Sequence, residues 1–277
     1  MNIKFLKIFL DKKDKIKILC LITAHPTKTT STLNHIKRTW LQHCDYSIYM
    51  KVPRERFSIK NGKKFKVLKL NMIKRKMSYW EKTKIYFKNI QKRYRNLCAF
   101  NWLLKVNDNS FVIIENLKRL LKNYDSNKSI YFGYHNKSFE MMEMYKEEYI
   151  PGGSGYVISI NGIKNMVEKK YKSKCSGSVQ GFEDIDILKC FENYGISRGN
   201  SIDEKGLQTF LPPAYKKDYY QSVSRNNKQL YNDYTLFPNG QREIDVMSEY
   251  PISFHNIDYK NVYFLYFIFY KGKIYYE

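Results

Sequence analysis

Apolar residues follow two alternating patterns along the first half of the chain. Short, nearly continuous apolar runs at 16–22 and 102–106 are typical of strands buried on both faces of a parallel sheet. Leu33, Ile36 and Trp40 are spaced as one face of a helix. Because the two patterns alternate with short connections, they predict an α/β fold in which a mainly parallel, twisted sheet is flanked by helices.

The same patterns predict the remaining elements. Further strands are expected at 46–52, 65–70 and 129–133, and helices at 30–42, 78–98, 113–124, 161–170 and 183–194. The polar, tyrosine-rich segment 216–242 predicts long loops, and the apolar run 262–270 predicts a buried strand or helix segment. The length of the chain fits a single domain over 1–277, with 1–15 as a short N-terminal segment outside the core.

The chain is strongly basic, with 49 Lys and Arg against 26 Asp and Glu and a net charge of +23. Clustered lysines would indicate a nucleic-acid partner, because they neutralise phosphates and release counterions. Here they are spread from Lys4 to Lys273, which favours a solvated basic surface, with anionic ligands such as a sugar nucleotide as the alternative. No nucleic-acid partner is expected.

No apolar run approaches the roughly 20 residues that a membrane-spanning helix needs. The segment from Met1 to Leu10 is short and interrupted by lysines, so it does not predict a signal peptide. Association with a membrane is therefore expected only through an anchor that is not visible in this chain.

The five cysteines include no close metal-type pair, which argues against zinc. Two disulfides among Cys20, Cys44, Cys175 and Cys190 are compatible with the predicted elements in an oxidising compartment. Reduced thiols in a cytosolic chain are the equal alternative from the residues alone.

Three polar features are candidates for chemistry. The segment 107–110, with the sequence NDNS, follows the strand expected at 102–106, and ligands of parallel sheets bind beyond the carboxyl ends of strands. Its alternative is a turn that bonds its own backbone. Glu183 and Asp184 begin an expected helix, where acids also compensate the helix dipole, and His255 is a lone histidine.

These features belong to an ordered series of short motifs. In chain order they are an apolar strand at 18–20, TW at 39–40 with a cysteine at 44, WLLKVNDNSFV at 102–112, IYFG at 130–133, GGSGYV at 152–157, EDI at 183–185 with a cysteine at 190, and SFH at 253–255. With them the chain resembles the core 1 β1,3-galactosyltransferases, within the Fringe-like β1,3-glycosyltransferase family, whose corresponding motifs include WFLKADDDTYV, GGAGYV and EDL. The resemblance extends from about Lys17 to Tyr276.

The resemblance implies a GT-A-type nucleotide-sugar-binding fold and a reaction. The reaction is the inverting transfer of galactose from UDP-galactose, in β1,3 linkage, to O-linked GalNAc on glycoproteins in the Golgi or another part of the secretory lumen. The family's DDD and later His hold Mn²⁺, which neutralises the diphosphate as a Lewis acid. Those ligand roles carry over to Asn107, Asp108, Asn109 and His255, and Asp108 and His255 are therefore expected to share one site.

Further roles are implied in the same way. The family's ED motif suggests Asp184 as the base that takes the proton from the acceptor hydroxyl, with Glu183 beside it. The residues implied for the uridine diphosphate are Thr23, Lys76, Trp80, Lys82 and Asp108. A secretory location implies disulfides between Cys20 and Cys44 and between Cys175 and Cys190, with Cys98 as a free thiol.

The chain also departs from the family pattern. Asn107 and Asn109 stand where the family has aspartates, and amide oxygens are poorer ligands for a hard cation. The tryptophan-rich acceptor segment corresponds to 230–234, without tryptophan. The alternative to an active enzyme is therefore a non-catalytic relative, either a chaperone or a glycan-binding protein. Direct neutralisation of the phosphates by Lys105 and the cations at 74–76 is expected to leave UDP binding with only a modest gain from Mn²⁺.

Overall fold

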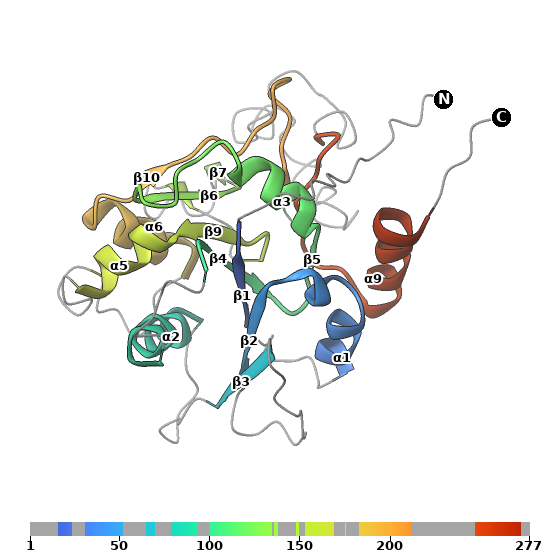
Figure 1. The fold of residues 1–277 in the computed structure, drawn as a ribbon, viewed down its shortest axis with the longest axis horizontal. Coiled ribbons are helices and arrows are strands. Elements are labelled where there is room, and N and C mark those ends of the chain that lie inside the picture. The colour runs from blue at the N-terminus through green and yellow to red at the C-terminus, as the bar shows by residue number, and fades with distance from the viewer. Residues whose placement is uncertain are drawn as a thin grey trace, which may run out of the picture.

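A seven-stranded sheet forms the centre of the computed structural model, which describes residues 16–23, 31–51, 65–69, 79–93, 100–134, 136–137, 148–149, 153–168, 175, 183–211 and 247–272. The strand order is β10-β6-β9-β4-β1-β2-β3 (Figure 1). The strands are β1 (Ile18–Thr23), β2 (Tyr46–Lys51), β3 (Phe65–Lys69), β4 (Trp102–Asn107), β6 (Ile130–Gly133), β9 (Tyr156–Ser159) and β10 (Ser197–Arg198). All neighbours are parallel except β9, which runs antiparallel to β4 and β6. The predicted α/β class and mainly parallel sheet are confirmed.

Helices cover both faces of this sheet (Figure 1). One face carries α1 (Ser31–Arg38), α3 (Ile114–Leu121) and α9 (Tyr259–Tyr266), and the other carries α2 (Tyr79–Arg93), α5 (Ile160–Glu168) and α6 (Glu183–Asn193). Side chains alternate along β1, so that Ile18 and Cys20 join the first core while Leu19 and Leu21 join the second. Burial on both faces explains why the strand reads as a continuous apolar run.

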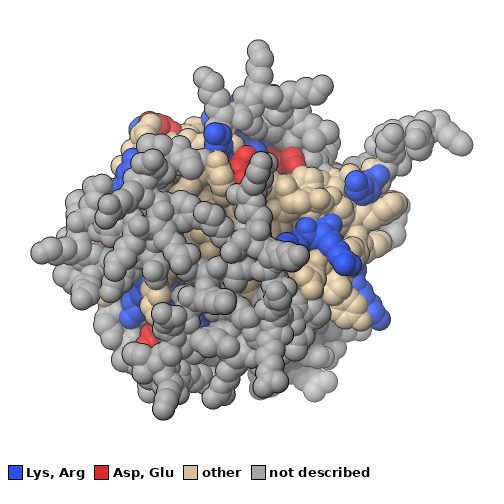
Figure 2. Space-filling model, turned by 60° about the horizontal axis from the view of Figure 1, so that its bottom comes forward, with Lys and Arg blue, Asp and Glu red and all other residues tan. Residues whose placement is uncertain are grey.

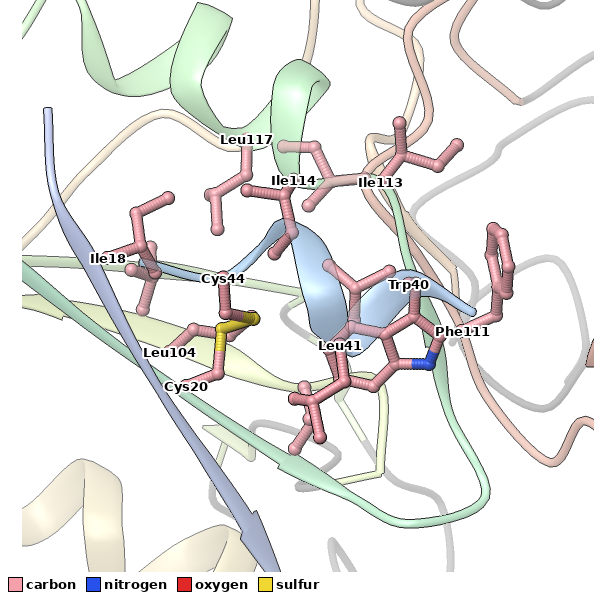
Figure 3. Close-up of a cluster of buried hydrophobic side chains, with 14 of the residues drawn as sticks. Ile18, Cys20, Trp40, Leu41, Cys44, Leu104, Phe111, Ile113, Ile114 and Leu117 are labelled. Atoms are coloured by element: carbon pink, nitrogen blue, oxygen red, sulfur yellow. A yellow bond between two sulfur atoms is a disulfide. The ribbon is translucent and has the colours of Figure 1, made fainter. Parts of the chain in front are cut away.

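The first core encloses a disulfide between β1 and Cys44, the residue that follows the short 3₁₀ helix η1 (Trp40–His43) (Figure 3). Cys20 and Cys44 are joined across 24 positions, with Trp40, Leu41 and Leu104 around them. A second disulfide joins Cys175 to Cys190 on α6, 15 positions away. Both predicted disulfides are thus present, and Cys98 lies outside the described residues.

The helix predicted at 30–42 is divided in two at Thr39, between α1 and η1. The Thr39 hydroxyl donates to the carbonyl oxygens of His35 (2.9 Å) and Ile36 (3.3 Å), which bends helices by competing with their backbone bonds. The Trp40 indole nitrogen donates to the Ser110 carbonyl oxygen at 3.0 Å. This contact ties the second half to a distant loop.

Two other expectations needed correction. The segment 156–159 was not expected to be a strand, yet it forms β9 between β4 and β6, before α5 begins. The run 262–270, expected to be a buried strand or helix segment, is helical in α9 and the π-helical turn η4 (Phe267–Lys271), but within it only Val262 and Phe269 are buried. The loops predicted at 216–242 lie outside the described residues.

A partly buried carboxylate attaches the C-terminal helices to the first core. Glu115 on α3 pairs with His43 Nδ1 at 2.9 Å and accepts a hydrogen bond from the Tyr270 hydroxyl at 2.6 Å. Burial alone would raise the pKa of Glu115, but the hydrogen bonds from His43 and Tyr270 outweigh it and lower the pKa. The same burial, together with the Glu115 charge, raises the pKa of Tyr270 well above its ordinary value.

The charged surface agrees with the dispersed lysines of the sequence. Figure 2 shows the described Lys and Arg side chains in several separate places on one face of the molecule. In the part of the chain that the structure describes, no helix has both the length and the apolar character to cross a bilayer.

Candidate active site

The carboxyl ends of β1 and β4 bring together the first two candidate residues. Thr23 and Asn107 are opposite each other in the parallel register. The Thr23 hydroxyl donates to Asn107 Oδ1 at 2.6 Å, and the Asp108 amide donates to the Thr23 carbonyl oxygen at 3.0 Å. This is the edge of the sheet at which α/β proteins bind ligands.

The NDNS segment forms a buried turn at this edge. The Ser110 amide donates to the Asn107 carbonyl oxygen at 3.2 Å, so the backbone turn offered by the sequence is present. The side chains of Asp108, Asn109 and Ser110 are buried. The Ser110 hydroxyl donates to the Gly153 carbonyl oxygen at 2.7 Å, and this bond ties the turn to the glycine-rich segment.

His255 reaches the same turn from the C-terminal part of the chain. A small sheet orders β11 (Phe210–Leu211), β12 (Ser253–Phe254) and β5 (Phe111–Val112), with Phe254 opposite Phe111. Just beyond β12, the Ile257 amide donates to the Asn109 carbonyl oxygen at 2.8 Å. A Cβ atom on Gly153 would overlap the His255 imidazole, so glycine is required for this ring to pack here.

Glu183 is connected to the turn through a buried lysine that lies in the middle of β4. The Lys105 ammonium is 2.8 Å from the Glu183 carboxylate, and Lys105 is fully buried between Leu21 and Tyr156 in the register. The Thr83 hydroxyl on α2 donates to the same carboxylate at 2.7 Å. The structure therefore differs from the expectation that Lys105 neutralises phosphates, because its charge is already paired.

The remaining candidates are placed less closely. Asp184 lies in the first turn of α6, next to Glu183, and its role as the base stays a prediction because its side chain is not described. Trp80 and Lys82 lie on α2, where Trp80 is fully buried in the second core and the Lys84 ammonium lies 5.3 Å from the centre of its ring. Lys76 lies outside the described residues.

The buried ion pair between β4 and α6 was not predicted from the sequence. Its signal was a lysine within an otherwise apolar strand, WLLKV, because a buried cation in a central strand needs an anion. Nothing in the sequence alone identified Glu183 as that anion.

The donor atoms at the turn do not fit a preformed Mn²⁺ site. Asp108 is the only carboxylate in the NDNS segment, and Asn107 Oδ1 already accepts the Thr23 hydroxyl. Asn109 Oδ1 is buried and has no hydrogen-bond partner among the described residues. Within the same residues, no group of three or more His, Cys, Asp and Glu is suited to a metal, whereas divalent cations of this kind require several oxygen ligands.

A cavity of about 600 Å³ lies elsewhere, beside α3. Its lining includes Arg119, Asn123, Asp203 and Tyr250, and none of the candidate residues. The chemistry inferred from the motifs is therefore not located in this cavity.

The NDNS, GGSGYV and SFH motifs, which are separate in the sequence, thus meet beside the carboxyl end of β4. Comparison with known proteins defines the class, because the profile of the Fringe-like family matches residues 21–236. The chain therefore belongs to the Fringe-like family, among the glycosyltransferases of β1,3-galactosyltransferase type.

A curated relative agrees with this membership. The chain is 30% identical over 257 residues to "Glycoprotein-N-acetylgalactosamine 3-beta-galactosyltransferase 1" of Xenopus laevis, over 92% of this chain and 67% of that protein. A solved glycosyltransferase involved in the glycosylation of the major capsid of PBCV-1 is 14% identical, with a TM-score of 0.32, over 56% of this chain and 63% of that one.

Proposed function

We propose that this chain is a single catalytic domain that transfers galactose from UDP-galactose, with inversion and in β1,3 linkage, to O-linked GalNAc on glycoproteins. The observation that carries the proposal is the meeting of Thr23, the NDNS turn and His255 at the carboxyl edge of the sheet. The name of the Xenopus laevis relative supports the choice of donor and acceptor.

The reaction follows from the proposed roles. The acceptor hydroxyl oxygen attacks the anomeric carbon of galactose from the face opposite the diphosphate. A new carbon–oxygen bond forms while the bond to the phosphate oxygen breaks, and UDP leaves with the bonding electrons. Asp184 takes the acceptor proton. Attack from the opposite face converts the α-linked donor into a β-linked product.

The two disulfides support a place for this reaction. Disulfides persist in oxidising compartments, and one of them lies inside the first core. We propose that the protein acts in the Golgi or another part of the secretory lumen, on a sugar-nucleotide donor and a glycoprotein acceptor.

The test is an assay of UDP-galactose with a GalNAc-bearing glycopeptide, with analysis of the product linkage. The expected product carries galactose β1,3-linked to GalNAc. Hydrolysis of UDP-galactose without transfer to GalNAc would contradict the proposed acceptor. Absence of both transfer and hydrolysis, with UDP still bound, would support a non-catalytic relative.

A further inference from the structure

A chain of polar contacts runs from helix α2 to the end of strand β1. Thr83 donates to Glu183 at 2.7 Å, and the Glu183 carboxylate is 2.8 Å from the Lys105 ammonium. Lys105 Nζ also lies 3.5 Å from Asn107 Oδ1, which accepts the Thr23 hydroxyl at 2.6 Å. The buried ion pair is thus continuous with the first residue of the NDNS turn.

These contacts determine how the Asn107 amide is oriented. An ammonium group only donates hydrogen bonds, so the amide atom facing Lys105 has to be the oxygen. The same oxygen also faces Thr23. The amide nitrogen diverges from this oxygen at the planar amide carbon, so it is not the atom that faces the ion pair. Asn107 is half-buried, which leaves part of this side chain accessible.

A nitrogen in that position cannot be a metal ligand, because its lone pair is delocalised into the amide and its two hydrogens are donors. It can donate to an anionic oxygen, and hydrogen bonds to charged groups are among the stronger ones. We propose that Lys105 and Glu183 are positioning residues that hold Asn107 as a hydrogen-bond donor to the diphosphate of the nucleotide. The inference rests on the proposed function, since it takes the ligand to be a nucleoside diphosphate.

The ion pair suits this role because its charges are matched. Lys105 and Glu183 are both buried, so removal of one partner leaves a buried charge without compensation and strongly destabilises the fold. Lys105→Met alone is therefore expected to fold poorly. Lys105→Met combined with Glu183→Gln removes both charges and keeps a side chain that can bond with Thr83.

The experiment measures UDP affinity by calorimetry, first in EDTA and then with saturating Mn²⁺. In the double variant, among the described residues, only the Thr23 hydroxyl still contacts the Asn107 side chain on this side, and because a hydroxyl can accept as well as donate, it allows the amide to turn over, which Lys105 does not. Metal-free UDP affinity should fall about tenfold or more, the effect of one hydrogen bond to a charged group, while the gain from Mn²⁺ should increase. A merely structural pair would lower both affinities equally and leave their ratio unchanged.

Two further variants sharpen the test. Asn107→Ala removes the donor without adding charge, and it should also lower the metal-free affinity about tenfold. The matched control is Thr83→Val, which removes a contact with Glu183 but none with Asn107, and it should leave the ratio of the two affinities at the wild-type value. An unchanged ratio in the double variant, or unchanged metal-free affinity in Asn107→Ala, overturns the inference. Absence of UDP binding by the wild-type chain in both conditions overturns the proposed function together with it.

Discussion

Restoring one aspartate at position 109 should make folding stability depend on Mn²⁺. Asn109 is buried at 4% exposure, and its Oδ1 atom has no hydrogen-bond partner within the described residues. Asn109→Asp would place a second carboxylate next to Asp108 in this confined turn. Two unit charges about 6 Å apart repel by about 3 kcal/mol at an effective dielectric constant of about 20.

Binding of Mn²⁺ should offset this loss of folding stability. Two adjacent carboxylates form a better site for a hard cation than Asp108 does with amide oxygens. A ligand at about 100 times its dissociation constant stabilises the folded state by about 2.7 kcal/mol, which nearly cancels the repulsion. For a chain of this size each kcal/mol corresponds to about 2–4 °C, so the melting temperature should fall by about 6–12 °C in EDTA and recover with Mn²⁺.

Thermal unfolding of wild type and variant in EDTA and in Mn²⁺ provides the measurement. The matched control is Asn116→Asp, at another buried asparagine, whose Nδ2 donates to the Pro251 carbonyl oxygen at 2.8 Å. This control should be destabilised to the same extent in both solutions. If Asn109→Asp is destabilised in EDTA without recovery in Mn²⁺, or if wild type is already strongly stabilised by Mn²⁺, the argument from charge is refuted.

Three other outcomes are expected. Asp184→Asn should abolish transfer and leave UDP affinity in calorimetry nearly unchanged, because the proposed base acts on the acceptor. Equal loss of transfer and of UDP affinity would indicate a structural role. Cys44→Ser should lower the free energy of unfolding in denaturant by about 3 kcal/mol, because the unfolded chain regains the entropy that a closed loop of this length removes. A change below about 1 kcal/mol would contradict this expectation. Because the pKa of Glu115 is lower in the folded state, its contribution to folding stability is present above the unfolded-state pKa and is lost as pH falls through the folded-state pKa. Glu115→Gln should therefore flatten the fall of the free energy of unfolding at acid pH. An unchanged fall would assign the acid sensitivity to other groups.

Much of the central sheet could be predicted because a strand buried on both faces is a continuous run of apolar residues in the sequence. The strands β1 and β4 read as apolar runs, and the helices between strands follow a 3.6-residue spacing. The strand β9 was missed because it has only four residues and directly precedes a helix. The break at Thr39 depends on a contact between Trp40 and Ser110, which lie 70 positions apart, and no local pattern could show it.

The candidate site was predictable in a similar, partial way. The structure brings Thr23, the NDNS turn and the segment around His255 to one edge, where strand ends of a parallel sheet meet, and their roles as ligands stay predictions. The role expected of Lys105 failed because its partner, Glu183, is 78 positions away and reaches it only through the packing of α6 against the sheet. Pairing of buried charges is a property of tertiary structure, so a local pattern could indicate that Lys105 needs an anion but not which one.

The paired lysine also changes the charge that a nucleotide would meet at this edge. Because Glu183 neutralises Lys105, the described residues around the NDNS turn contribute one carboxylate, that of Asp108. A diphosphate brings about two to three negative charges, and the aspartates of the family pattern would add two more that only a cation could offset. With asparagines at 107 and 109 these two charges are absent, and in the proposed arrangement the Asn107 amide nitrogen donates to the diphosphate. Under the proposed function, the two asparagines therefore reduce both the carboxylates available to a metal and the negative charge that it has to offset.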